Sequence, residues 1–371
     1  MVLAFSTVQR EQPVKGNSFC YAAALLIGLP AFGGSAQAEI ATDGAYAEHG
    51  QATSGAMLPL AFDLGFSLPK PNMASIGVTS FRDPQAEPEE SVTELPSSSV
   101  QEGTSRPGWT DHVPRSASPY PTFGSQVHRI KWESLGALGY FTAVNSPKFF
   151  KETTSLHFKN EGWFGKSTEN LGVDKLTHAF DSYILAEILH ARLHAKTDAA
   201  SGDALTAAVL ATGLMFYSEL YDGIETDSGI SLQDMVMNAA GATFSLLRNT
   251  TPGLREKLDF RLLLMPNSDI YTRTGKRHYA QQRYLLALQL AGFQRFEGTP
   301  LRFVELHAGY YASGFTSEDI ARGERPRRHL FFGIGINLRE LFLRAPRSTA
   351  GRVVGVGLDY IQLPYTAAHW K

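Results

Sequence analysis

The stretch VDKLTHAFDSYILAEILHARLHA, residues 173–195, decides the fold because its apolar residues recur with the period of an α-helix. At 100° per residue, Asp174, His178 and Asp181 fall within about 60° of one another, opposite the apolar arc. This polar stripe becomes apolar within two turns, which a solvent-exposed helix face does not usually do. The stretch therefore predicts a helix that carries polar side chains into a helical bundle.

Two further helices follow this one, and a shorter helix precedes it. Residues 203–222 end at Asp222-Gly223, a good C-terminal stop, and residues 231–248 begin with Ser-x-x-Asp, which resembles a capping box. Residues 130–143 carry apolar side chains at helical spacing. The segment LTAAVLATGLMFY, residues 205–217, is nearly all apolar, so its helix is either central in the bundle or in contact with lipid.

The period of the sequence changes after Pro266, where four strand-like runs are bounded by polar or Gly/Pro stretches. The predicted fold class is therefore α+β: a small bundle of about four helices followed by an antiparallel four-stranded β meander. We expect the meander to pack on the helices or to lie against another surface. The four runs are QRYLLALQLAGF (282–293), RFVELHAGYYASGF (302–315), RHLFFGIGINL (328–338) and RVVGVGLDYIQL (352–363).

Residues 1–38 have the three parts of a secretory signal. Positive residues precede an apolar run, Phe19–Phe32, and Ala36-Gln37-Ala38 supplies the small residues that suit signal peptidase. Because the apolar run is short and interrupted, we expect a cleaved signal peptide, with an uncleaved N-terminal anchor as the alternative. Cys20 stands at the start of the apolar run, whereas lipidation would require a cysteine after it.

The remaining chain divides into a linker and one folded domain. Residues 39–126 are rich in Ser, Pro and Glu, which predicts a disordered linker. The domain is expected over 127–371, with helices over about 130–250 and strands over about 270–365. The formal net charge of −2 provides no global field that would attract nucleic acid. Cys20 is the only cysteine, so the mature chain is expected to have no disulfide and no thiolate metal site.

Acidic and histidine side chains on the three long helices form the candidate site. Short connections make neighbouring helices antiparallel, which brings Glu219 and Asp222 near Asp234. Three interpretations of a cluster that also includes Asp174 and His178 stay open. It is a structural network of paired buried charges, a divalent metal site with these five residues as ligands, or a head-group or sugar pocket in which they act as general acid and base. In the structural interpretation, Lys175 is expected to pair with Glu219 or Asp222. The surrounding polar network is assigned to Lys175, Ser231 and Asn238.

Two basic segments are interpreted as solvated. His190 and His194 are spaced i, i+4 beside Arg192 and Lys196, which predicts a basic, solvated helix end. The cluster RGERPRR, residues 322–328, predicts a solvated hairpin loop, and contact with anionic lipid head groups is the alternative.

Four motifs, taken in order, resemble a known bacterial family. Between about 155 and 365 the chain is similar to the YfiM-like predicted periplasmic lipoproteins and, more weakly, to VanZ-like membrane proteins. The resemblance implies a periplasmic or outer-membrane location and assigns no activity, and the chain departs from the family in lacking a lipobox cysteine. The motifs are NEGWFG (160–165), DKxxH (174–178), ExxDG (219–223) and SxxDxxxNxxG (231–241).

The sequence therefore predicts an exported bacterial envelope protein, in the periplasm or at the outer membrane. Its expected role is non-catalytic, structural or binding, at a membrane surface or with an envelope component. The alternative is a metal- or acid/base-dependent hydrolase or transferase acting on envelope lipid or glycan. The two hypotheses differ at His178, because an enzyme needs an open pocket there, whereas a structural network would be sealed and fully paired.

Overall fold

The structure is a computed structural model that describes residues 119–266, 275–344 and 348–371. The predicted signal peptide, residues 1–38, and the predicted linker before residue 119 lie outside the described residues. The first helix among the described residues, α2, begins at Phe123, within the last residues assigned to the linker.

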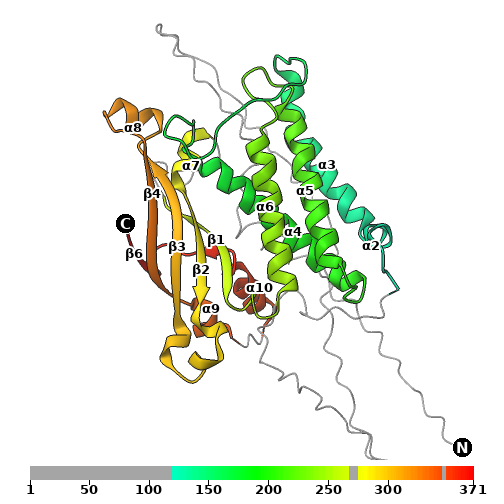
Figure 1. Cartoon of the computed structure of the whole chain (residues 1–371), viewed down its shortest axis with the longest axis vertical. Helices are drawn as coiled ribbons and strands as arrows, with labels where there is room; N and C mark the ends of the chain where they lie inside the picture. Colours follow the sequence, from blue (N-terminus) through cyan, green and yellow to red (C-terminus); the bar gives the residue numbers. More distant parts are fainter. Residues whose placement is uncertain (1–118, 267–274, 345–347) are drawn as a thin grey trace, which may run out of the picture.

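Five α-helices lie between residues 119 and 266, and Figure 1 shows the three longest side by side. The central one contacts two other long helices and three strands, and 17 of its 24 residues are buried. The predicted helices over 173–195, 203–222 and 231–248 are therefore present, with Ser231 as the N-terminal cap of the third. The five are α2 (Phe123–Arg129), α3 (Lys131–Asn145), α4 (Val173–Lys196), α5 (Asp203–Asp222) and α6 (Leu232–Thr250).

A curled, mixed sheet of six strands lies beside the bundle, in the order β5-β1-β2-β3-β4-β6. Every neighbouring pair is antiparallel except β1 and β5, which are parallel. The fold class is thus α+β. The strands are β1 (Leu258–Leu264), β2 (Gln282–Gln289), β3 (Val304–Ser313), β4 (Arg327–Ile336), β5 (Ile361–Gln362) and β6 (Ala367–Trp370).

Short helices occupy the connections around the sheet. The α-helices are α7 (Gly275–Gln281), α8 (Ser317–Ala321), α9 (Leu338–Phe342) and α10 (Thr349–Gly357). The 3₁₀ helices η2 (Leu290–Gly292), η3 (Gln294–Phe296) and η4 (Pro300–Phe303) lie between β2 and β3, whereas η1 (Ser146–Phe150) follows α3 in the bundle.

The predicted set of four strands is wrong in its last member. The run 352–363 forms most of α10, and only Ile361–Gln362 is a strand, which pairs in parallel with β1. Val353 and Val356 are buried on one side of α10, so tertiary packing overrides their β-propensity. Strand β1 lies before Pro266, where the sequence analysis expected none, and β6 was also not predicted.

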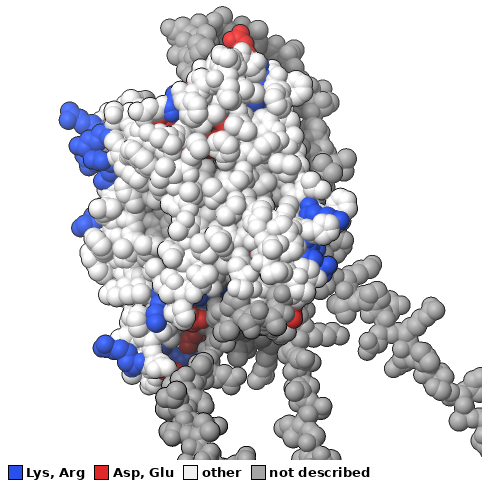
Figure 2. All heavy atoms as spheres, turned by 45° about the vertical axis from the view of Figure 1, so that its right-hand side comes forward, with Lys and Arg blue, Asp and Glu red and all other residues white. Residues whose placement is uncertain are grey.

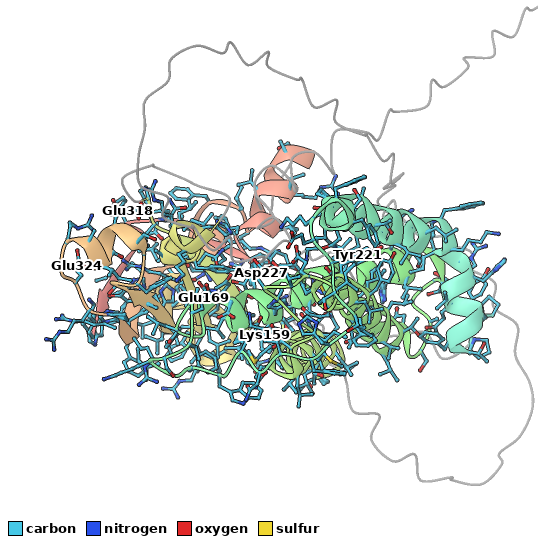
Figure 3. The ribbon with its side chains drawn as sticks, turned by 90° about the horizontal axis from the view of Figure 1, so that it is seen from above. Lys159, Glu169, Tyr221, Asp227, Glu318 and Glu324 are labelled. Atoms are coloured by element: carbon cyan, nitrogen blue, oxygen red, sulfur yellow. The ribbon has the colours of Figure 1, made fainter. Side chains whose placement is uncertain are left out.

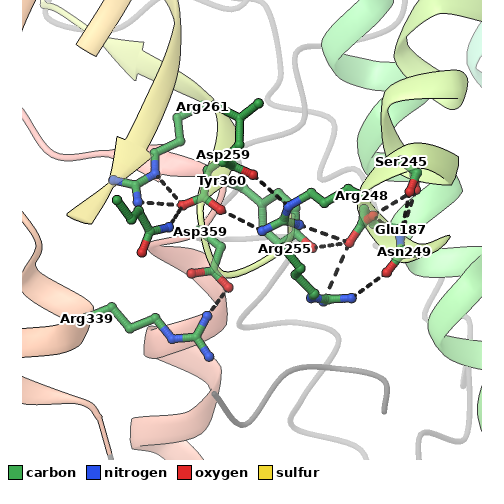
Figure 4. A network of polar contacts seen from close by, with 12 residues as sticks. Glu187, Ser245, Arg248, Asn249, Arg255, Asp259, Arg261, Arg339, Asp359 and Tyr360 are labelled. Carbon is green, nitrogen blue, oxygen red and sulfur yellow. Dashed lines mark hydrogen bonds and ion pairs between the residues drawn. The ribbon is translucent and has the colours of Figure 1, made fainter. Parts of the chain in front are cut away.

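A buried polar network joins the bundle to the sheet (Figure 4). The Arg248 guanidinium on α6 contacts Glu187 Oε2 on α4 at 3.3 Å and Asp259 Oδ1 on β1 at 2.6 Å. Tyr360 donates a hydrogen bond to the same Glu187 oxygen at 2.8 Å. Although burial opposes ionisation, Arg255 and Arg248 lower the pKa of Glu187, so this carboxylate stays charged inside the protein. The network fixes how α4 and α6 sit on β1.

Helices α4 and α6 approach each other closely at Gly241. A β-carbon added there would overlap the backbone carbonyl oxygen of Ala179, which cannot move without shifting α4. Gly241 is the last residue of the SxxDxxxNxxG motif, so this motif contains a packing requirement as well as polar groups.

We predict that Gly241→Ala destabilises the fold by about 1–3 kcal/mol, because the added methyl group forces the two helices apart. Chemical denaturation of the full chain measures the loss. Gly213→Ala on α5, where an added β-carbon meets nothing within 4 Å, is the matched control and should be near neutral or slightly stabilising. Equal stability of the two variants would contradict the proposed close approach.

Candidate functional site

The centre of the site is the buried ammonium group of Lys175, near the start of α4. Its Nζ lies 2.6 Å from Glu161 Oε2, 3.0 Å from Asp174 Oδ2 and 2.8 Å from Asp234 Oδ1. Burial disfavours the charge, but the three carboxylates outweigh it and raise the pKa of Lys175. One cation therefore holds together the loop before α4, α4 itself and the start of α6.

His178 lies one turn further along α4, between two carboxylates. Its Nδ1 is 3.4 Å from Glu219 Oε1 on α5, and its Nε2 is 3.6 Å from Asp234 Oδ1 on α6. Burial disfavours the imidazolium, but Asp234 and Glu219 raise the pKa of His178 to about 9. The side chain is 24% exposed, and Nδ1 has no hydrogen-bond partner among the described residues. We call Glu161, Asp174, Lys175, His178, Glu219 and Asp234 the polar centre.

Glu219 is the most perturbed acid of the polar centre. Burial raises its pKa to about 8, although His178 opposes this shift. Asp234 behaves in the opposite way: burial disfavours its charge, but His178 and Lys175 lower its pKa. Near neutral pH, the centre thus holds an ionised aspartate beside an imidazolium and a carboxylic acid that can each release a proton.

A loop from residue 151 to residue 170 covers the outer end of the polar centre. It is attached to the connection 223–230 by bridges between Thr153 and Glu225 and between Phe158 and Ile230. Seen from above, Lys159 and Asp227 lie close together, and the Lys159 ammonium donates to the Asp227 carbonyl oxygen (Figure 3). This loop supplies Glu161, which belongs to the NEGWFG motif but was not among the predicted site residues.

Four of the five candidate residues, Asp174, His178, Glu219 and Asp234, meet in the polar centre, and one does not. Asp222 is paired instead with Lys148 of η1, in a short contact at the end of α5. Three sets of ligand-type atoms among the described residues, each within 4.8 Å of one another, could hold a metal ion; one is His190, His194 and Asp203, and the other two lie in the polar centre. The two sets in the polar centre are His178, Glu219 and Asp234, and Glu161, Asp174 and Asp234.

The three residues assigned to the polar network have different surroundings. Lys175 is paired with the carboxylates described above. Ser231 Oγ accepts from the Asp234 backbone N–H at 3.2 Å, so it caps α6 and positions Asp234. Asn238 is 1% exposed, and neither its Oδ1 nor its Nδ2 has a partner among the described residues. Lys175 was expected to pair with Glu219 or Asp222, and this expectation was wrong because Glu161, Asp174 and Asp234 surround its ammonium group.

The segment that contains the polar centre also matches a known protein family. Residues 160–250 match the family model for predicted periplasmic lipoproteins (DUF2279). The matched segment begins in the loop that holds Glu161 and ends with α6, so it contains the whole polar centre. This agrees with the YfiM-like resemblance and supports a location in the periplasm or envelope; the similarity to VanZ-like proteins stays a prediction. No curated protein and no solved structure matches the chain.

A second polar cluster corrects the prediction of a basic, solvated end of α4. His190 and His194 are buried, and both bind the carboxylate of Asp203 at the start of α5, with distances of 3.2 Å and 2.7 Å. Burial disfavours the charge on Asp203, but the two imidazoles lower its pKa to about 2. Spacing alone could not reveal this partner, because the turn that returns Asp203 to the two histidines is a tertiary feature.

We predict that Glu219→Gln changes the pH dependence of stability. The folded-state pKa of Glu219, about 8, is above its usual value of 4.5, so the folded protein holds an extra proton between these values. The contribution of Glu219 to the free energy of unfolding therefore falls as pH rises through this window, and glutamine removes that loss. Between pH 5 and pH 8, the free energy of unfolding of the variant should therefore rise by roughly 1–3 kcal/mol relative to that of wild type.

Urea denaturation at the two pH values measures this gain, and exposed Asp227→Asn is the control that should show none. A pH-independent difference between Glu219→Gln and wild type would mean that Glu219 is ionised throughout.

Proposed function

We propose that this chain is an envelope protein that binds a membrane surface through an apolar side of its helical bundle. The observation that carries the proposal is that the exposed residues on the body of α5 and α6 include no charged side chain. We call this surface the charge-free face. Its members are Leu205, Val209, Gly213 and Phe216 on α5, and Leu232, Val236, Ala240, Thr243 and Leu247 on α6.

The extent of this surface supports contact with lipid rather than with water. Figure 2 shows a broad face that is nearly free of charged side chains, with Lys and Arg at its edges. Isolated apolar residues are normal on a protein surface, but a continuous apolar surface with polar edges is typical of an interaction site. Basic residues around it would meet the anionic head groups of a membrane.

Helix α5 is more consistent with lying against a membrane than with crossing it. It is long and apolar enough to span a bilayer, with a mean hydropathy of 1.3 over its best window. However, 56% of that window is buried, and Ala207, Ala211 and Met215 pack in the bundle core. Because one side of α5 packs in the bundle core, only its exposed apolar side can enter the lipid boundary, to a depth of about 5–10 Å.

The sheet has an unusual polarity that fits the same proposal. Phe332, Ile334 and Ile336 on β4 are about half exposed, whereas Glu305 and His307 on β3 are buried. The buried side is satisfied by an ion pair between Arg261 and Glu305 at 3.0 Å. An antiparallel sheet with one face in water normally shows the reverse pattern, so this sheet also presents an apolar surface to its surroundings.

We predict that the purified full chain floats with phospholipid vesicles and stays bound at high salt, because apolar burial is not screened by ions. The double variant Val209→Lys/Val236→Lys should lose most of this binding while keeping its fold. Ile320→Lys on α8, which is also exposed and apolar, is the matched control and should float like wild type. If wild type and the double variant float equally, or neither floats, the charge-free face does not bind membranes.

A second candidate function is favoured by one observation at the polar centre. His178 is partly exposed and lies between Glu219, which holds a proton near neutral pH, and ionised Asp234. Near neutral pH, the His178 imidazolium and the Glu219 carboxylic acid can each donate a proton, and the ionised Asp234 carboxylate can accept one, which is a suitable arrangement for general acid–base catalysis. The chain would then act as a hydrolase or transferase on the lipid or glycan that its membrane contact brings near.

This candidate predicts that His178→Gln abolishes the conversion of envelope phospholipid or lipid-linked glycan by the vesicle-bound protein. The substitution should leave flotation unchanged, because His178 lies outside the charge-free face. Mass spectrometry of the extracted lipids measures conversion. If the lipid is unmodified after long incubation with wild type, the catalytic candidate fails and only the membrane-binding role remains.

A further inference from the structure

A groove of about 440 Å³ runs between α5 and α6 and opens within the charge-free face. It exists because small residues stand where the two helices face each other: Ala208 and Gly213 on α5, and Ala239 and Ala242 on α6. Leu205, Val209 and Phe216 belong both to the wall of the groove and to the charge-free face. An apolar chain could therefore pass from a bilayer into the groove without crossing polar surface.

Asn238 is the polar residue that distinguishes this groove from an ordinary packing defect. It lines the groove, yet it is 1% exposed and both of its amide atoms lack partners among the described residues. Leaving a buried polar group unpaired is unfavourable, because the group loses its hydrogen bonds to water without replacing them. Among the described residues, no charged side chain lines the groove. The partner that Asn238 fits is therefore an uncharged group that accepts hydrogen bonds, with or without a donor of its own.

We infer that this groove holds one acyl chain of an envelope lipid, with the ester or amide group of that chain hydrogen-bonded to Asn238. The inference deepens the proposed function and rests on it, because the chain enters from the membrane that the charge-free face contacts. The charged head group of the lipid stays outside the groove, which offers it no counter-charge. The groove volume lies within the range typical of small-molecule sites.

The experiment uses the full-length protein and a phosphatidylethanolamine with one fluorescent acyl chain, presented in mixed phospholipid vesicles. Energy transfer from Trp163 and the other tryptophans to the label, after separation from the vesicles, reports retained lipid. Ala239→Phe fills the groove and should reduce retained lipid about tenfold or more. Asn238→Leu keeps the size of the side chain but removes the amide, and should reduce it by about tenfold, as expected for one lost hydrogen bond.

Ala321→Phe is the matched control, because it places the same ring on the exposed surface of α8, outside both the groove and the charge-free face. It should retain lipid like wild type. Equal retention by Ala239→Phe, Asn238→Leu and Ala321→Phe would overturn the inference.

Flotation of the same variants separates this inference from the proposed function. If wild type floats but retains no labelled lipid, the groove is not a lipid site while membrane binding stands. If wild type neither floats nor retains lipid, both proposals fail. If native mass spectrometry shows two chains without lipid, the groove binds a second copy of the protein. If residues 19–32 cross-link to the groove, it binds a segment of its own chain. Either result would overturn the inference that a lipid occupies the groove.

Discussion

Helix α4 is buried on almost all sides while carrying lysine, histidine, aspartate, glutamate and arginine side chains, and this constraint organises the rest of the structure. Each buried charge must find a partner, because an uncompensated charge in the interior costs several kcal/mol. Lys175 finds Glu161, Asp174 and Asp234. Glu187 finds Arg248, and the paired histidines find Asp203. The partners come from the covering loop, α5, α6 and, through Arg248, the sheet.

This arrangement separates the polar and apolar surfaces of the bundle. Polar side chains of α5 and α6, such as Glu219 and Asp234, turn inward to pair with α4. Their outward surfaces are consequently left to apolar and small residues, which is the reverse of a water-facing helix. The same inversion occurs in the sheet, where Glu305 is buried and Ile334 is exposed. The proposed contact with a membrane and the observed polar centre inside the bundle would together explain both features.

Much of the bundle could be predicted from the sequence, because helix periodicity and end signals are local. The ends of α5 and the Ser231 cap of α6 follow from Gly223 and from the Ser-x-x-Asp spacing. The run 352–363 was assigned wrongly, since its valines favour strands in isolation and only their packing in α10 decides otherwise. Strand β1 was missed for a related reason, because a seven-residue buried strand has no clear alternation.

The sequence predicted which residues belong to the candidate site better than it predicted which of them form ion pairs with one another. Antiparallel helices place Glu219 near Asp234, and this could be inferred from short connections alone. Glu161 was missed because it lies in a loop, where no periodic pattern indicates its contact with Lys175. Asp222 was wrongly included in the site, because no local sequence pattern indicates that it pairs with Lys148. The groove beside Asn238 depends on which small residues of two helices face each other, a property of packing that no single segment contains.

The most direct test of membrane contact through the charge-free face is the accessibility of a spin label at position 236, compared with one at position 320, on vesicle-bound full-length protein. The account predicts that the label at 236 is accessible to oxygen dissolved in the lipid and protected from water-soluble nickel, while the label at 320 shows the opposite. Equal exposure of both labels to aqueous nickel would contradict it.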